Sequence, residues 1–326
     1  MTPQNKNSIK QQRKAESRVV GTLQSTLLYC KNPKRLVLRL LPLLPLSDER
    51  YLKIWYRISY GESLNLKYPQ TYNEKLQWLK LYDHQPLYTT LVDKFAVKQY
   101  VTEKIGEKYV IPLIAVWNNP SEIDFKSLPE QFVLKVTHGG GSYGVAVCKD
   151  KKTFDREKAL RMLENAMKVD GYLKNREWPY KNVPRRVIAE KYMEDNETNE
   201  LRDYKFFCFN GVPKLLFVAT GRGVQKEPNF DWFDMSYNHI QLKTEHPNSD
   251  KNHLPQKPVT FEEMKEVAAK LSQGIPHVRI DLYEVNGKVY FGEYTFYHWS
   301  GINRFEPEEW NKKMGDWIQL PDTKNV

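Results

Sequence analysis

The sequence predicts an α+β fold in which antiparallel hairpins are combined with helices. Two apolar segments end at the turn dipeptides Asn210-Gly211 and Asn286-Gly287, and a further apolar segment follows each turn. Asn-Gly between apolar segments is a strong signal for a two-residue hairpin turn. Strands and helices do not alternate regularly along the chain, which argues against a doubly wound parallel sheet. We therefore expect antiparallel strands combined with helices.

Five segments show apolar residues at the three-to-four spacing of a helix. The first starts at Asp48, with Ser47 or Asp48 as its cap, and the second opens with the capping-box sequence Thr71-Tyr72-Asn73-Glu74. The last opens at Thr260, ahead of two glutamates. We expect these helices at about 48–58, 71–81, 93–105, 154–170 and 260–273.

Short apolar runs bounded by turn residues indicate the strands. The last four of these runs form the two hairpins around the Asn-Gly turns, and the earlier runs lie before residue 193. We expect strands at 110–116, 132–136, 145–148, 186–192, 203–210, 214–219, 278–285 and 288–294.

Length and composition are those of a folded protein. The chain has 326 residues, of which 40% are hydrophobic and 13% aromatic. This content argues against a disordered chain, and the length suggests about two domains. The cysteines Cys30, Cys148 and Cys208 are far apart, so neither a zinc site nor a disulfide framework is expected. We expect a cytoplasmic protein, because a reducing compartment suits such cysteines.

Positive charge is concentrated near the N-terminus. Of the net charge of +10, residues 1–46 contribute +8, from nine basic residues and one acidic residue. The Leu-rich part, 36–46, is too short to span a bilayer. It either packs on the protein or contacts an anionic membrane, in which case the protein is peripheral on the inner face of the plasma membrane. Nucleic acid is not an expected partner, because no zinc-finger, RRM or basic-zipper pattern occurs.

A lysine followed by a glycine-rich turn is the first group of residues with chemical potential. Lys135 ends an expected strand, and the turn 138–144 contains four glycines. Glycines let the backbone approach a ligand closely, and consecutive N–H groups can bind phosphate. The pattern is neither a P-loop nor a dinucleotide fingerprint, since no helix follows it. We predict a phosphate site, with a flexible hairpin tip as the alternative; His138 either contacts phosphate or caps the turn.

Two further groups complete the candidate site. Glu190 lies in the strand-like run 187–193, where its carboxylate could accept a ribose hydroxyl and backbone groups could bind adenine; a solvated edge glutamate is the alternative. Arg279, Asp281 and Glu293 share one face of the last hairpin, with the two carboxylates opposite each other. Facing carboxylates repel unless a cation neutralises them, and Mg²⁺ would do so. The alternative is a salt bridge from Arg279 to one carboxylate.

In this order, the three groups resemble the ATP-grasp superfamily. The chain from about 47 to 320 resembles more specifically the TupA-like ATP-grasp family, which is associated with teichuronopeptide, capsule and other cell-surface polysaccharide synthesis. Thr295 stands where the family usually has a metal-binding Asn. The segments that carry the resemblance are 68–80, Asp93-Lys94, 135–144, 203–211, 279–283 and 291–297.

The resemblance implies an ATP-grasp fold, in which two α+β subdomains clamp ATP, behind an N-terminal helical segment. The implied division is a basic, Leu-rich segment at 1–46, a helical region at 47–108 and the ATP-grasp domain at 109–326. Within that domain, 109–195 would carry the glycine-rich loop and 196–326 the metal site. ATP and Mg²⁺ are the implied cofactors.

The resemblance also assigns residues to roles. Metal ligands would be Asp281, Glu293 and Thr295, and catalytic residues Arg279, Lys205 and Arg222. The acceptor would contact His298, Ser300, Asn303 and Arg304. Which of Lys94, Lys98 and Lys205 gives a second phosphate contact is left open. Nucleotide-binding residues would be Lys94, Lys135, His138, Gly139, Gly140, Gly141, Ser142, Tyr143, Gly144, Glu190, Lys191, Tyr192 and Met193.

The implied activity is ATP-dependent carbon–nitrogen ligation. A carboxylate of a surface-glycan precursor would attack the γ-phosphate of ATP, and an amino acid or other amine would capture the acyl phosphate. A glycosyltransferase is one alternative, although the sequence contains no Asp-x-Asp motif. A kinase is another; the HRD and DFG motifs of protein kinases are absent, which leaves a kinase built on the ATP-grasp fold.

Overall fold

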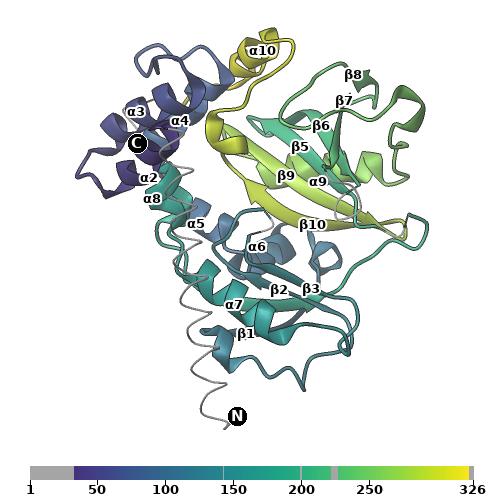
Figure 1. The fold of residues 1–326 in the computed structure, drawn as a ribbon. Coiled ribbons are helices and arrows are strands. Elements are labelled where there is room, and N and C mark those ends of the chain that lie inside the picture. The colour runs from purple at the N-terminus through teal and green to yellow at the C-terminus, as the bar shows by residue number, and fades with distance from the viewer. Residues whose placement is uncertain (1–32, 142, 199, 222–226, 323–326) are drawn as a thin grey trace, which may run out of the picture. The chain divides into compact units, whose positions relative to one another are not determined.

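A computed structural model describes residues 33–141, 143–198, 200–221 and 227–322 (Figure 1). The chain divides into two compact units, with the boundary after Leu64. The expectations for residues 1–32, Ser142 and Arg222 lie outside the described residues. None of the helices in the described part of the chain has the length and apolar character needed to cross a membrane.

The described part of the first unit, from residue 33 on, contains the helices α2 (Pro33–Leu40) and α3 (Asp48–Tyr60), with a short 3₁₀ turn directly after α2. The hydroxyl of Ser47 accepts the backbone N–H of Arg50 at 3.4 Å, so Ser47 is the N-cap of α3, as expected. Gly61, with φ of +97°, ends the helix. The Leu-rich segment, for which packing on the protein and membrane contact are the two alternatives, overlaps the short helix α2.

The first sheet of the second unit has four strands in the order β1-β4-β2-β3, with every neighbour antiparallel. Helix α7 (Arg156–Met167) covers one face, where Phe132, Leu134 and Leu163 share a core. Strands 132–136 and 145–148 were predicted correctly. The run expected at 110–116 joins this sheet only from residue 113, directly after Pro112, which has no N–H for a ladder, whereas Val110 forms an isolated bridge with Phe291. The strands are β1 (Leu113–Trp117), β2 (Phe132–Val136), β3 (Val145–Cys148) and β4 (Val187–Lys191).

The second sheet has six strands in the order β10-β9-β5-β6-β7-β8. Both expected hairpins are confirmed: Asn210 and Gly211 have φ of 51° and 82°, and Asn286 and Gly287 have φ of 51° and 69°. Positive φ at both central residues defines the type I′ turn. Helix α9 (Phe261–Ser272) agrees with the helix expected at 260–273. The strands are β5 (Asp203–Phe209), β6 (Val212–Thr220), β7 (Asn229–Asp234), β8 (His239–Ile240), β9 (His277–Val285) and β10 (Lys288–Thr295).

The remaining helices, which come before, between and after these strands in the sequence, were only partly predicted. The capping box of α4 (Tyr72–Tyr82) is confirmed, with Thr71 and Glu74 bonded to each other's backbone N–H. The helix expected at 93–105 begins only at residue 96, because Asp93 is extended and its side chain accepts the N–H of Phe95 at 2.9 Å. The others are α5 (Pro86–Val92), α6 (Ala96–Ile105), α8 (Gly171–Asn175) and α10 (Glu309–Trp317).

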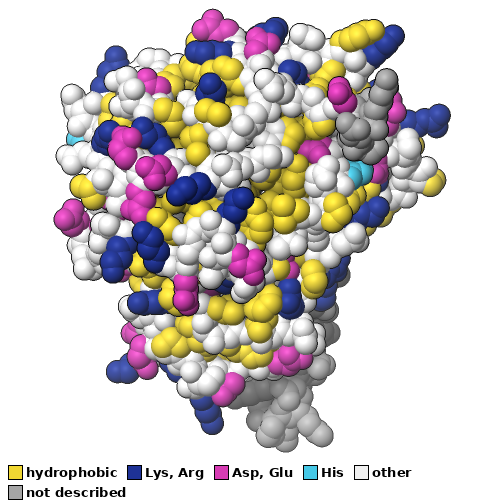
Figure 2. Space-filling view, turned by 180° about the vertical axis from the view of Figure 1, so that it is seen from behind, with side chains coloured by type: hydrophobic (Ala, Val, Ile, Leu, Met, Phe, Trp, Pro, Cys, Tyr) yellow, Lys and Arg dark blue, Asp and Glu magenta, His cyan; other side chains and the backbone are white. Residues whose placement is uncertain are grey.

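Charged side chains of both signs are interspersed on the surface. On the face drawn in Figure 2, basic and acidic side chains lie next to each other with hydrophobic groups between them. This face therefore presents a mixed surface and not a continuous basic one.

Candidate active site

One face of the first sheet combines apolar side chains with Lys135. Val133 and Lys135 alternate with core residues along β2, and the register places them beside Val147 and Val145 of β3. The side chain of Val147 is 49% exposed, whereas the opposite face is covered by α7. An open apolar surface beside a lysine suits a flat base joined to phosphates. The valines were not among the predicted site residues, although the alternation along 132–136 places Val133 on the same face as Lys135.

Glu190 lies between two lysines on this face. Its carboxylate oxygens are 2.6 Å from Nζ of Lys135 and 2.5 Å from Nζ of Lys98. Burial would raise the pKa of Glu190, but the two lysines hold it down to about 2. Since β4 is an inner strand and the Glu190 side chain is only 7% exposed, the solvated edge alternative is excluded. The contacts show Glu190 as the anchor of both lysines, and its ribose role stays a prediction.

The glycine-rich turn is shaped by close packing at its base. Gly144 has φ of +73°, and a Cβ there would lie 2.6 Å from Cγ2 of Val136 and 2.8 Å from Cβ of Ala166. Its carbonyl accepts the N–H of Val136 at 3.0 Å, which closes the hairpin. Gly140, at the tip, has open space around it. The turn therefore has a fixed base and an exposed tip beside Lys135.

His138 points into the protein at the base of this turn. Its Nε2 lies 3.2 Å from the carbonyl oxygen of Ala166 in α7. Burial lowers the pKa of His138, so the neutral ring donates Nε2–H to that carbonyl. This contact holds the ring against α7, and the choice between its two expected roles stays a prediction.

The two carboxylates of the last hairpin face each other. Asp281 of β9 and Glu293 of β10 are partners in the register. Asp281 is fully buried, and Arg279 donates to both of its oxygens, from Nε at 2.6 Å and from Nη2 at 2.8 Å. Lys205 of β5 also bonds Asp281 and lies 3.2 Å from Asp203. The salt bridge considered as an alternative from the sequence is therefore present.

Lys94 is the main partner of Glu293. Its Nζ lies 2.8 Å from Oε2, whereas Nη2 of Arg279 is 3.9 Å from Oε1. Burial would raise the pKa of Glu293, but Lys94, Lys205 and Arg279 hold it at about 2. The backbone N–H of Lys94 donates to the carbonyl of Thr137 at 3.1 Å. Lys94 therefore joins the end of β2, beside the glycine-rich turn, to the carboxylate on β10.

The carboxylate pair fits a magnesium ion that is also bound by phosphates. Mg²⁺ usually takes one or two carboxylates together with substrate phosphate oxygens, and Asp281 and Glu293 supply such a pair. Over the described ranges of the chain, no cluster of three or more His, Cys, Asp or Glu is arranged to hold a metal. The hydroxyl of Thr295 accepts Nη2 of Arg279 at 3.0 Å. Further ligands would therefore have to come from the nucleotide.

His298 extends the site beyond Arg279. Its Nδ1 lies 2.7 Å from Nη1 of Arg279. Burial, with the charge of Arg279, holds the pKa of His298 well below its usual value. The neutral ring accepts the guanidinium N–H at Nδ1 and carries its proton on Nε2. That buried Nε2 has no hydrogen-bond partner among the described residues, so its N–H is an unpaired donor inside the protein.

Ser300 belongs to a hydrogen-bonded chain with Lys80 and Glu177. Lys80 and Glu177 were not among the site residues predicted from the sequence. Nζ of Lys80 donates to Oγ and to the carbonyl of Ser300, both at 2.9 Å, and Ser300 donates to Oε1 of Glu177 at 2.6 Å. Burial lowers the pKa of Lys80 to about 8, and burial raises the pKa of Glu177. The one sequence signal for Lys80 is a charge inside the apolar run 78–81.

Asn303 and Arg304 occupy different environments. Asn303 is fully buried, and its carbonyl accepts Nδ2 of Asn73 from α4 at 2.7 Å. Arg304 is exposed. Before them, Trp299, Ser300 and Gly301 all have positive φ, of 47°, 56° and 68°. This turn directs Ser300 toward Lys80 and Glu177.

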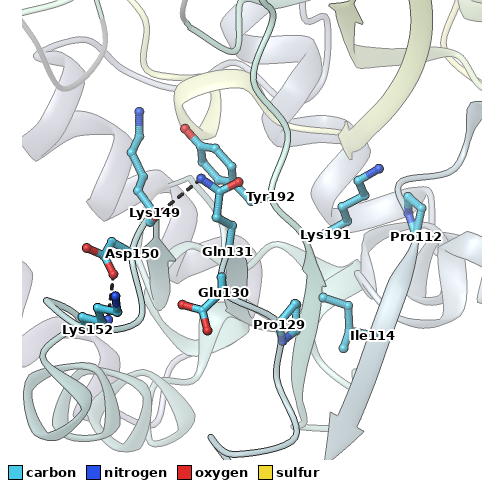
Figure 3. Close-up of a pocket in the computed structure, with 10 residues that line it drawn as sticks. All are labelled: Pro112, Ile114, Pro129, Glu130, Gln131, Lys149, Asp150, Lys152, Lys191 and Tyr192. Carbon is cyan, nitrogen blue, oxygen red and sulfur yellow. Dashed lines mark hydrogen bonds between the residues drawn. The ribbon is translucent and has the colours of Figure 1, made fainter.

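The predicted adenine segment lines two cavities. Lys191, Tyr192 and Met193 face a cavity of about 270 Å³ that also includes residues of the β9–β10 turn. A wider cavity of about 800 Å³ contains Lys191 and Tyr192 together with Lys149 and Gln131. In Figure 3 the side chains of Lys149, Gln131, Lys191 and Tyr192 extend toward the same side. The end of β4 therefore offers space beside the apolar face of the sheet.

Comparisons with known proteins agree with the resemblance. A family model described as TupA-like ATPgrasp matches residues 74–319. A search of curated proteins gave no match. A solved D-alanine-D-alanine ligase from Helicobacter pylori is 14% identical, with a TM-score of 0.42, over 76% of this chain and 69% of that chain.

Two other solved structures show similar values. The D-alanine-D-alanine ligase of Bacillus anthracis is 15% identical, with a TM-score of 0.37, over 64% of this chain and 57% of its own. The D-cycloserine synthetase DcsG is 18% identical, with a TM-score of 0.37, over 68% of this chain and 70% of its own. Likeness at this level says nothing about substrates. Because the family model spans well over half of the sequence, this chain belongs to the TupA-like ATP-grasp family, and the expected ATP-grasp fold is confirmed.

Proposed function

We propose that this protein is an ATP-dependent ligase that joins a carboxylate to an amine through an acyl phosphate, with Mg²⁺ as cofactor. The observation that carries the proposal is the link between two parts of the site. Lys94 is bonded through its backbone to Thr137, beside the glycine-rich turn, and through its side chain to Glu293, opposite Asp281. Lys94 thus connects the turn that would bind phosphate to the carboxylates that would bind metal. The names of the similar structures, which include ligases, agree with this activity.

Different residues would bind the base, the phosphates and the metal ion of Mg-ATP. The valine face of β2 and β3 and the segment 191–193 would hold the base, and Lys135 with the turn 139–144 would hold the phosphates. Asp281 and Glu293 would hold Mg²⁺, which when bound neutralises charge on the transferred phosphoryl group. Arg279, fixed by Asp281 and His298, would stabilise negative charge that develops at the reacting carbon and phosphorus atoms.

The acceptor would lie beyond Arg279. The free Nε2 of neutral His298 and the chain Lys80–Ser300–Glu177 offer donors and a carboxylate on that side. We propose a carboxylate on a cell-surface polysaccharide precursor, with an amino acid or similar amine as nucleophile. Support for the polysaccharide comes from the family to which the chain belongs. Glu177, with one oxygen held by Ser300, is placed to orient the incoming amine.

The domain division is part of the same proposal. The four-stranded sheet falls within 109–195, which carries the glycine-rich turn, and the six-stranded sheet falls within 196–326, which carries the carboxylate pair. We propose that these two parts are the subdomains that clamp ATP, preceded by the helical region 47–108 and the segment 1–46.

Product mass tests the activity. Purified protein is incubated with Mg-ATP, uronic acids as carboxylates and amino acids as amines, and the products are analysed by mass spectrometry. A gain of one amino acid minus water, with release of ADP and phosphate, is the expected result. Glu293→Gln and Asp281→Asn should remove the product, whereas Glu157→Gln on the exposed side of α7 should not. Addition of a phosphate would indicate a kinase, and addition of a hexose from a sugar nucleotide would indicate a glycosyltransferase.

We propose in addition that residues 1–46 bring a cytoplasmic protein to an anionic membrane surface. Leu36, Leu40 and Leu43 are 41%, 48% and 77% exposed. The nine basic residues of 1–46 complement anionic headgroups, at about 1 kcal/mol for each residue near the surface. Exposed leucines next to basic residues are typical of segments that lie in a membrane interface.

A further inference from the structure

Two connected groups of ion pairs occupy the proposed nucleotide site. In one, Lys98 and Lys135 share Glu190. In the other, Lys94 holds Glu293, while Asp281 is held by Arg279 and Lys205. Each carboxylate that is proposed to bind metal therefore already has a cation as its partner.

This arrangement opposes binding of a divalent cation alone. Both oxygens of Asp281 accept hydrogen bonds from Arg279, so the carboxylate offers few lone pairs. A metal at Glu293 would lie beside the ammonium of Lys94, which is 2.8 Å from Oε2. Like charges at such distances repel, and more strongly in a partly buried site than in water. The Glu293 side chain is 25% exposed, so a cation could reach it from solvent. Lys94, as its ion-pair partner, is the group that opposes this cation.

A nucleotide gives Lys94 another partner. Its backbone is fixed to Thr137, the residue before the glycine-rich turn that would hold the phosphates. A lysine side chain is long and flexible, so its ammonium can leave Glu293 for a phosphate oxygen while the backbone stays in place. Glu293 then faces the phosphates without its counter-ion, and a divalent cation can bridge them.

We propose that Lys94 is a resident counter-ion of Glu293 that moves to the nucleotide phosphates, so that the divalent cation binds only after the nucleotide. This inference rests on the proposed function, because it requires that a nucleotide binds beside the glycine-rich turn. It adds an order of binding and assigns that order to one lysine.

Mn²⁺ binding, followed by the loss of the free-ion signal in electron paramagnetic resonance, tests the inference without turnover. Binding lost in Glu293→Gln under the same conditions is counted as binding at this site. In the wild type, site binding should be weak with Mn²⁺ alone and at least about tenfold tighter with the non-hydrolysable analogue AMP-PCP, within the usual range of coupling between two ligands. Lys94→Met should tighten binding of Mn²⁺ alone by about tenfold and reduce the gain from AMP-PCP by a similar factor, leaving the part that comes from phosphate oxygens as metal ligands.

Lys98→Met is the matched control. Lys94 and Lys98 are four residues apart, both side chains are 14% exposed, and each pairs with a glutamate. Only Lys94 pairs with a proposed metal ligand, so Lys98→Met should leave the affinity for Mn²⁺ alone unchanged. If both substitutions tighten Mn²⁺ binding equally, general charge and not the Lys94–Glu293 pair is responsible, and the inference is wrong.

The comparison of the wild type with and without AMP-PCP, referenced to Glu293→Gln, stands even if Lys94→Met or Lys98→Met does not fold. Site binding of Mn²⁺ that is equally tight with and without AMP-PCP would overturn the ordered binding. Binding of a fluorescent ATP analogue without divalent cation, measured in parallel, separates the two claims. If that analogue binds and Mn²⁺ binding is independent of it, only this inference fails. If no nucleotide binds at all, the proposed function fails together with the inference.

Discussion

Replacing Glu190 by Gln should destabilise the protein through the two lysines that this glutamate holds. The carboxylate lies 2.6 Å from Lys135 and 2.5 Å from Lys98. A neutral amide cannot neutralise either ammonium, and two lysines would remain close together on a largely buried face. Removing one partner of a buried ion pair commonly costs about 3–5 kcal/mol.

The pKa of Glu190 gives an independent magnitude. Its fall from 4.5 to about 2 on folding corresponds to about 3 kcal/mol of stabilisation at pH 7. Burial lowers the pKa of Lys98 although Glu190 raises it, so part of this gain is offset at the lysine. We therefore expect Glu190→Gln to lower the free energy of unfolding by about 2–3 kcal/mol at pH 7.

The sign of the pH dependence follows from the lowered pKa. Because the folded protein binds this proton less tightly than the unfolded chain, the stabilisation is complete well above pH 4.5 and is lost as the pH falls toward 2. The difference between wild type and Glu190→Gln should therefore shrink to about 1 kcal/mol at pH 3.

Urea unfolding followed by tryptophan fluorescence measures this difference. Glu157→Gln is the control, because Glu157 makes an ion pair with Arg161 at 3.1 Å but its side chain is 87% exposed. It should change stability by no more than about 0.5 kcal/mol. If Glu190→Gln and Glu157→Gln have the same small effect at pH 7, the two lysines are not held by Glu190 as the structure shows.

Three further predictions concern the turn, the buried lysine and the N-terminal segment. Gly144→Ala should lower the free energy of unfolding by about 1–3 kcal/mol, because φ is +73° and the new Cβ would collide with two side chains. Gly140→Ala, with open space around the new Cβ, should be nearly neutral. Thermal unfolding of both variants measures the difference. Burial lowers the pKa of Lys80 from 10.5 to about 8, so the unfolded chain binds more protons between these values and the free energy of unfolding should rise with pH there. In Lys80→Met this rise should be lost, as measured by urea unfolding at pH 8 and pH 10. The same rise in the variant as in the wild type would contradict the prediction. Removal of residues 1–46 should weaken sedimentation with anionic vesicles and leave ATP binding intact, and equal sedimentation of both forms would refute membrane contact.

Local interactions explain which parts of the fold were predictable. Both hairpins follow from Asn-Gly turns that need positive φ at each central residue, as at Asn210 and Gly211. The start of α4 follows from the capping box of Thr71 and Glu74, two residues three apart. In such cases the residues that decide the structure are neighbours in the sequence, so their pattern is sufficient.

Long-range contacts explain what was missed. Helix α6 starts late because Asp93 is extended and forms an ion pair at 2.6 Å with Arg186, far along the chain. Lys80 and Glu177 are joined to the site through Ser300, more than a hundred residues away from either. No periodicity in the sequence brings such residues together.

Part of the candidate site was also predictable, where it depends on residues that are close in the sequence. Asp281 and Glu293 were placed opposite each other by counting from the Asn286-Gly287 turn, and the register confirms it. The choice between Lys94 and Lys98 could not be made, because the two are four residues apart and would share one face of the helix expected at 93–105. Their partners depend on which strand each meets in the folded protein: Lys94 meets β10 and Lys98 meets β4.

The transfer of oxygen from the carboxylate to phosphate tests the ligase mechanism most directly. The carboxylate substrate identified by product mass is labelled with ¹⁸O, and the inorganic phosphate is analysed after reaction with Mg-ATP and the amine. An acyl phosphate requires that one carboxylate oxygen leaves with the phosphate, so we predict one ¹⁸O in each phosphate and an amide product. Phosphate without label, or a stable phosphorylated product with no phosphate released, would contradict the mechanism proposed for this site.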